Sequence, residues 1–142
     1  MKQRKGGERE DGTKSATLSR YVRPRAGLAK SLFVCQNIRS ISSTNMEEFK
    51  RLLTILNSVD IIALQEVWDG KAAPTLPGFN EPYMRCRSGQ RGGGVALYVK
   101  SHLNCKEVSS TFIQNYLETI AMDITTKGKI CRYINIYRPP NS

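Results

Sequence analysis

The chain is poor in the side chains that usually bind zinc. It has one histidine, His102, and four cysteines that lie far apart, with no Cys-x-x-Cys pair. Zinc sites and small disulfide-stabilised domains need such residues at close, regular spacing, so neither class is expected. The cysteines are predicted to be free thiols, and His102 is interpreted as a surface residue.

A long apolar run is also missing. No stretch approaches the ~18 consecutive apolar residues of a membrane-spanning helix. Charged residues occur throughout the N-terminal region, which therefore lacks the apolar segment of a secretory signal. We expect an intracellular protein, nuclear or cytoplasmic, that is neither secreted nor embedded in a membrane.

Acidic residues are scarce relative to basic ones. The 22 Lys and Arg exceed the 12 Asp and Glu, for a net charge of +10. Residues 1–30 hold nine basic and three acidic residues, or +6, and few large apolar side chains. They are predicted to form a disordered basic arm before a domain at residues 31–142. A basic balance favours polyanionic partners such as nucleic acid, although a solvated tail beside a mildly basic domain explains the same charge.

The domain begins with a strand–helix–strand pattern. Ser31–Gln36 is a short apolar run that ends at Asn37. Met46, Phe49 and Leu53 then follow the spacing of one helical face, and Val59–Leu64 is a second apolar run. Two continuous apolar strands around one helix are typical of a βαβ unit, so the strands are predicted to be parallel.

The later apolar runs predict antiparallel strands joined by short turns such as Lys127-Gly128. The fold class is therefore α/β, with a mixed sheet that starts with βαβ and continues antiparallel. The expected later strands are Tyr83–Arg87, Val95–Val99, Cys105–Thr111, Leu117–Ile124 and Ile130–Ile136.

Polar residues follow both parallel strands. Asn37 follows the first strand and Glu66 comes shortly after the second. Because parallel strands bring ligands to their carboxyl ends, we expect the two side chains to lie near each other. Glu66 would suit a hard cation such as Mg²⁺, with Asn37 as its neutral neighbour. The plainer alternative is a turn-forming Asn and a solvated Glu.

Tyr137 ends the last predicted strand, where Arg138-Pro139-Pro140 opens a loop. A Tyr hydroxyl there can donate to a phosphate oxygen, and Arg138 can pair with phosphate. The alternative is a boundary aromatic residue whose hydroxyl meets water.

A glycine run and several arginines lie after the βαβ unit and before the expected strand Val95–Val99. Arg91 and Gly92-Gly93-Gly94 suit an anion-binding nest, but a turn that leads into a strand is favoured. Arg85, Arg87 and Arg91 are candidates for nucleic-acid binding, or else a charged edge strand. Trp68 is interpreted as a lid over the core in preference to a platform for stacking substrate.

Four motifs occur in the order of one known family. They are Cys-Gln-Asn37-Ile-Arg-Ser, Asp60-Ile-Ile-Ala-Leu-Gln-Glu66, Gly92-Gly-Gly-Val-Ala-Leu-Tyr-Val and Tyr137-Arg-Pro-Pro-Asn-Ser. Through them, residues 31–142 resemble the endonuclease/exonuclease/phosphatase superfamily. Within it, the chain looks most like the apurinic-type endonuclease domain of non-LTR retrotransposons. The glycine run is weak alone, but four motifs in register are a strong signal.

The resemblance implies the N-terminal half of a four-layer α/β sandwich that cuts DNA with Mg²⁺. Glu66 would bind the metal, Asn37 would lie beside it, and Tyr137 would lie near the scissile phosphate. Glu118 is carried over only as a possible acidic site residue. The family mechanism is in-line attack by water, with Mg²⁺ stabilising the developing charge. The nick would leave a 3′-hydroxyl that primes reverse transcription.

The sequence departs from the family in two segments. Neither Gly-Asp-x-Asn nor Ser-Asp-His occurs in it. Acid–base groups contribute ~10²–10⁴-fold each, so we expect the chain alone to be inactive. A half-domain is also expected to expose the apolar inner face of its sheet and to self-associate through it. Two alternatives remain open: a basic nucleic-acid-binding module without catalysis, and a phosphatase branch of the same superfamily.

Overall fold

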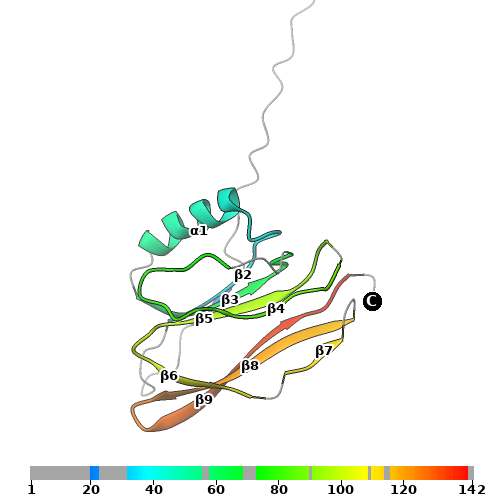
Figure 1. Cartoon of the computed structure of the whole chain (residues 1–142). Helices are drawn as coiled ribbons and strands as arrows, with labels where there is room; N and C mark the ends of the chain where they lie inside the picture. Colours follow the sequence, from blue (N-terminus) through cyan, green and yellow to red (C-terminus); the bar gives the residue numbers. More distant parts are fainter. Residues whose placement is uncertain are drawn as a thin grey trace, which may run out of the picture.

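The computed structural model describes residues 20–22, 32–55, 58–68, 73–89, 91–108, 110–113 and 116–140. Figure 1 shows these residues as one helix lying on two stacked sheets. The elements are β1 (Arg20–Val22), β2 (Leu32–Asn37), α1 (Ser43–Ile55), β3 (Val59–Gln65), β4 (Tyr83–Arg85), β5 (Val95–Val99), β6 (Asn104–Glu107), β7 (Phe112–Ile113), β8 (Leu117–Thr126) and β9 (Lys129–Tyr137). The predicted basic arm lies outside the described residues except for β1, which pairs antiparallel with β2.

The first sheet has the strand order β1-β2-β3-β5-β4. β2 and β3 are parallel and are joined by α1, which confirms the predicted βαβ unit. β5 pairs antiparallel with both β3 and β4. Every residue of β5 and all of β3 except Asp60 are buried. Their continuous apolar runs follow from cover on both faces of the sheet.

The second sheet is built around β8, which pairs antiparallel with β6, β7 and β9. The register of β8 and β9 runs from Glu118 opposite Tyr137 to Thr126 opposite Lys129. The two-residue turn between them, Lys127-Gly128, has positive φ at both positions, 49° and 74°. That combination is typical of a type I′ hairpin, and it confirms the predicted turn.

Two apolar clusters hold the layers together. On the outer face of the first sheet, α1 contributes Met46 and Phe49 to a cluster with Val34, Ile62 and Leu64. Between the sheets, alternate residues of β3 and β5 meet alternate residues of β8; this second cluster contains Ile61, Ala63, Val95, Leu97, Val99, Ile120, Met122 and Ile124. The period of two along each strand therefore gives the first sheet one face for the helix and one for the second sheet.

The inner face of the first sheet is covered, contrary to our expectation. Ile61, Ala63 and Leu97 on that face have no exposed surface, because β8 and β9 of the same chain pack onto it. The expectation failed because the sequence pattern does not show that the later strands form their own sheet. Self-association through the inner face would have no exposed apolar surface to use.

The large exposed apolar side chains lie elsewhere. Ile130, Ile134 and Ile136 of β9 are more than half exposed and alternate with residues that face the first sheet. The layers of the described residues are thus helix, sheet and sheet, and the four-layer sandwich stays a prediction. The four cysteines are free, as predicted. In the described part of the chain, α1 is too short and too polar to cross a membrane.

Candidate functional site

The structure brings Asn37, Glu66 and Tyr137 together at one edge of the two sheets. The Tyr137 hydroxyl donates a hydrogen bond of 2.6 Å to Glu66 Oε1. The side chain of Asn37 lies close enough to the Glu66 carboxylate to lower its pKa. Another donor is Trp68, whose Nε1 lies 3.4 Å from Glu66 Oε2. One carboxylate therefore receives side chains from three different strand ends.

Strand register explains this meeting. Asn37, the last residue of β2, is opposite Gln65, the last residue of β3, so Glu66 follows directly at the same edge. Tyr137 ends β9 in the second sheet and packs against the cluster between the sheets. The parallel pair places Asn37 beside Glu66, and the stacking of the sheets brings Tyr137 to both.

The backbone at this edge adopts unusual conformations. Arg39, Ser40, Glu66 and Trp68 all have positive φ, at 49°, 116°, 55° and 64°. Non-glycine residues rarely adopt such angles, and where they do they often mark functional sites. The two loops stabilise each other, since Ser40 N donates to Glu66 O at 2.7 Å and Ile41 N donates to Val67 O at 3.0 Å.

Asn45 fixes the first of these loops and was missed by the sequence analysis. Its side-chain Nδ2 lies 3.0 Å from Ile38 O, 3.4 Å from Arg39 O and 3.3 Å from Ser40 O. An Asn in the first turn of a helix is a common capping residue, so its position alone gave no signal of this contact. Asn45 thus ties the start of α1 to the loop that follows Asn37.

The hydrogen bonds control the charge on Glu66. Partial burial raises the pKa of its carboxyl, but the bonds from Tyr137, Asn37 and Trp68 and the nearby charge of Arg39 outweigh burial and lower the pKa overall. Burial and the Glu66 carboxylate raise the pKa of Tyr137 to about 12. At neutral pH the site therefore holds an ionised Glu66 and a protonated Tyr137.

Exposed arginines lie on the loops that meet at this edge of the sheets. Arg39 lies close enough to lower the pKa of Glu66. The Arg91 guanidinium lies 4.9 Å from the ring centre of Trp68, and that of Arg138 lies 6.0 Å from the ring of Tyr116. All three arginines are exposed. Among the residues that the structure describes, the site thus has one acid, Glu66, with exposed arginines on the neighbouring loops; Arg39, Arg91 and Arg138 are called the basic rim.

Two of the other candidates for nucleic-acid binding are held in ion pairs. Arg87 is 10% exposed, and its Nε lies 2.5 Å from Oε1 of Glu118. Arg85 is half-buried and pairs with Glu107. Arg87 therefore cannot present its charge to a ligand in solvent, in contrast to the prediction, because its charge is neutralised inside the protein. The sequence could not reveal this pairing, since the partners are far apart along the chain.

Glu118 is also occupied. Its side chain has no exposed surface, its Oε1 accepts from Arg87, and its Oε2 accepts from Gly94 N at 2.5 Å. With both oxygens engaged inside the protein, Glu118 does not suit the role of acidic site residue that was considered for it. Both of its contacts are structural: one is with Arg87, and the other is with Gly94 in the glycine run.

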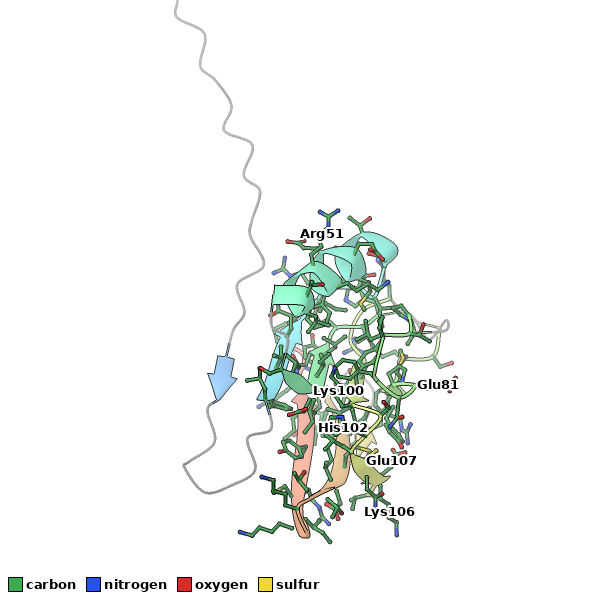
Figure 2. The ribbon with its side chains drawn as sticks, turned by 90° about the vertical axis from the view of Figure 1, so that its left-hand side faces the viewer. Arg51, Glu81, Lys100, His102, Lys106 and Glu107 are labelled. Atoms are coloured by element: carbon green, nitrogen blue, oxygen red, sulfur yellow. The ribbon has the colours of Figure 1, made fainter. Side chains whose placement is uncertain are left out.

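Trp68 and His102 lie at opposite ends of β3. Trp68, interpreted as a lid, contacts the site itself through Glu66 and Arg91. His102 is exposed in the turn after β5, next to Lys100, and lies 3.9 Å from Asp60 near the start of β3 (Figure 2). His102 is exposed, as expected of a surface residue, and Figure 2 shows it near Lys100.

The side chains at the site fit a hard cation that takes most of its ligands from water and substrate phosphate. Among the described residues, no group of three or more His, Cys, Asp or Glu could hold a metal ion. Of the residues that the structure describes here, Glu66 supplies the carboxylate, with the Asn37 amide beside it. Mg²⁺ often binds through one or two carboxylates and completes its shell with water and substrate phosphate, so the residues present fit this ion.

Comparison with known proteins agrees with the motifs. A search of curated proteins finds no match. Residues 36–141, well over half of the chain, match the Endonuclease/Exonuclease/phosphatase family. The match spans Asn37, Glu66 and Tyr137, and the fold has the two sheets and mixed α/β arrangement consistent with that family. The chain therefore belongs to the endonuclease/exonuclease/phosphatase family.

Proposed function

We propose that the chain carries the Glu66 side of a Mg²⁺-dependent phosphodiesterase site of the endonuclease type. The observation that carries this proposal is the contact of Tyr137 with Glu66 at 2.6 Å, with Asn37 on the same carboxylate. Glu66, Asn37 and Tyr137 come from three separate strand ends and meet at one carboxylate. Glu66 and Trp68 both adopt left-handed backbone conformations, which cost free energy. Solvated loop residues that met by chance would not need such conformations.

Each residue has a distinct role in this proposal. Glu66, ionised because its pKa is lowered, would bind the cation together with the Asn37 amide. When bound, Mg²⁺ would supply Lewis-acid stabilisation of charge on the phosphate. Tyr137 stays protonated up to high pH because its pKa is about 12. Its one hydroxyl proton, which is donated to Glu66 in this structure, would turn to a phosphate oxygen when the cation and substrate are bound.

The basic rim supports DNA as the substrate. Arg39, Arg91 and Arg138 place positive charge on loops that come from three different strand ends. A small phosphomonoester needs one such charge, whereas a strand offers phosphates on both sides of the scissile one. The retrotransposon type is proposed on the sequence motifs Gly92-Gly-Gly-Val-Ala-Leu-Tyr-Val and Tyr137-Arg-Pro-Pro.

We further propose that this chain binds DNA but hydrolyses it negligibly by itself. The only Asp and His among the described residues are Asp60, Asp123 and His102. Asp60 and His102 lie at the far end of β3, and Asp123 pairs with exposed Arg132 on the outer face of β8. No described Asp or His is therefore placed to activate water beside Tyr137, and a missing general base costs ~10²–10⁴-fold.

DNA binding tests the role of the basic rim. Fluorescence anisotropy with a labelled duplex, measured over a range of salt, should give a log–log slope that falls by about 0.9 for each phosphate contact removed. Arg91→Ala and Arg39→Ala should each lower the slope. Arg51→Ala is the matched control, because Arg51 is an exposed arginine that points outward from α1 (Figure 2). Equal slopes for all three variants would refute the rim.

A nicking assay separates an enzyme from a binding module. Supercoiled plasmid with Mg²⁺ should show no nicking above the Glu66→Ala control. If DNA binding is unaffected by Glu66→Ala and by Mg²⁺, the alternative of a module without catalysis is favoured. Nicking that depends on Glu66 would show instead that the chain is a competent nuclease.

A further inference from the structure

The glycine run between β4 and β5 makes room for a buried arginine. Gly93 has a φ of 67°, and a Cβ added to it would overlap Nε, Cζ and Nη2 of Arg87. Gly94 has a φ of 83°, and a Cβ there would lie 2.8 Å from a methyl group of Val67. The glycines are therefore needed for close packing as well as for their backbone angles, a role that neither the predicted turn nor the alternative of an anion-binding nest included.

The same run is bonded to the segment that carries Glu66. Trp68 N donates to Gly93 O at 2.9 Å, and Val67 N approaches Gly94 O at 3.4 Å. On the other side, Gly94 N donates to Glu118 Oε2 at 2.5 Å. A continuous path of contacts thus joins Glu118 and Arg87 to the residues that directly follow Glu66.

Glu118 is also linked to the other half of the site. In the register of β8 and β9 it lies directly opposite Tyr137. One buried carboxylate therefore holds the glycine run with its side chain and lies beside Tyr137 through its strand. Any shift of Glu118 would move the Glu66 segment and Tyr137 relative to each other.

We propose that the Arg87–Glu118 pair is a positioning device that sets the Glu66 segment against Tyr137 by way of the glycine run. Its consequence for catalysis rests on the proposed function, but the positioning itself does not. A buried ion pair is a poor source of stability, because desolvation offsets much of the attraction. What this pair provides is a fixed acceptor for Gly94 N and a planar cation packed on Gly93.

The test uses Trp68, which is the only tryptophan in the sequence and hydrogen-bonds Glu66. Gly93→Ala should shift the Trp68 emission to longer wavelength and increase its quenching by iodide. Gly89→Ala is the matched control, since Gly89 has a φ of 68° and no atom within 4 Å of an added Cβ. Both variants experience the same backbone strain, but only Gly93→Ala displaces Arg87.

Charge variants extend the test to the pair itself. Glu118→Gln and the double variant Arg87→Met with Glu118→Gln should change Trp68 emission in the same way as Gly93→Ala. The double variant leaves no unpaired buried charge, so it keeps the test valid if the single variant does not fold. Ile124→Ala, a core truncation in β8, controls for lost stability alone.

The outcomes are distinct when all spectra are recorded well below each melting temperature. Altered Trp68 emission in the pair and Gly93 variants, with wild-type emission in Gly89→Ala and Ile124→Ala, supports the positioning role. Wild-type emission in every variant, whatever the loss of thermal stability, would overturn it and leave the pair purely structural. Neither result depends on DNA binding or nicking, so a failure of the proposed function is recognised separately.

Discussion

Asn135 is a buried polar link between the two sheets, and its removal should be costly. It is 2% exposed. Its Nδ2 donates to Leu64 O and Ala96 O at 2.9 Å each, and its Oδ1 accepts from Gln65 Nε2 at 2.5 Å. Asn135 thus joins β9 to β3 and β5 close to the site. Its partner Gln65 directly precedes Glu66, and Asn135 itself lies two residues before Tyr137. We predict that Asn135→Ala loosens the contact between the sheets at the floor of the site.

The expected size follows from the three hydrogen bonds. Each contributes about 0.5–1.5 kcal/mol net, so their loss should cost about 3 kcal/mol of unfolding free energy. Gln65 keeps a second partner, because its Nε2 also lies 3.1 Å from Cys35 Sγ. For a domain near 100 residues this corresponds to a drop in melting temperature on the order of 10 °C.

The assay is thermal and urea unfolding followed by circular dichroism, with Asp123→Asn as the control. Asp123 lies on the same pair of strands as Asn135 but on the outer face, in an exposed pair with Arg132 at 2.7 Å. Exposed pairs contribute little, so Asp123→Asn should leave the melting temperature almost unchanged. If Asn135→Ala destabilises the protein no more than Asp123→Asn, the polar link does not hold the sheets.

Three further predictions concern pH and packing. Spectrophotometric titration should show Tyr137 ionising near pH 12, in the same range as buried Tyr98, and Glu66→Gln should lower only the value for Tyr137. Because the raised pKa favours the protonated folded state, the stability from Tyr137 should decline as pH rises from about 10 to 12. The lowered pKa of Glu66 has the opposite effect. The stability that ionised Glu66 contributes should be present above pH 4.5 and should be lost as the pH falls further. In acid unfolding, the Glu66→Gln variant should lack this loss. Phe49→Ala, which empties the contact of α1 with the first sheet, should cost about 3–5 kcal/mol in urea unfolding, and a cost below 1 kcal/mol would show that the helix packs differently.

Local sequence signals predicted the part of the site that depends on strand ends. Asn37 and Glu66 directly follow apolar runs, and parallel strands must place their carboxyl ends at one edge. Tyr137 was found in the same way, at the end of a strand that prolines terminate. The βαβ start was predictable because helical and extended periods differ within a few residues.

The contacts across the sheets could not be predicted, because they join distant segments. Arg87 and Glu118 are 31 residues apart, and each resembles an ordinary surface charge in the sequence. Asn135 stands within an apolar run and gives no sign that it bonds Leu64 and Ala96. The cover of the first sheet by β8 and β9 also depends on long-range packing, which periodicity does not encode.

The central claim is that Glu66, with Asn37 and Tyr137, binds a divalent cation together with a phosphodiester. The most direct measurement is a Mg²⁺ titration followed by Trp68 fluorescence, with an oligonucleotide that carries a non-hydrolysable phosphorothioate. The account predicts a saturable change in emission that Glu66→Gln abolishes and that Glu81→Gln, an exposed loop acid, retains. An identical Mg²⁺ response in wild type and Glu66→Gln would contradict it.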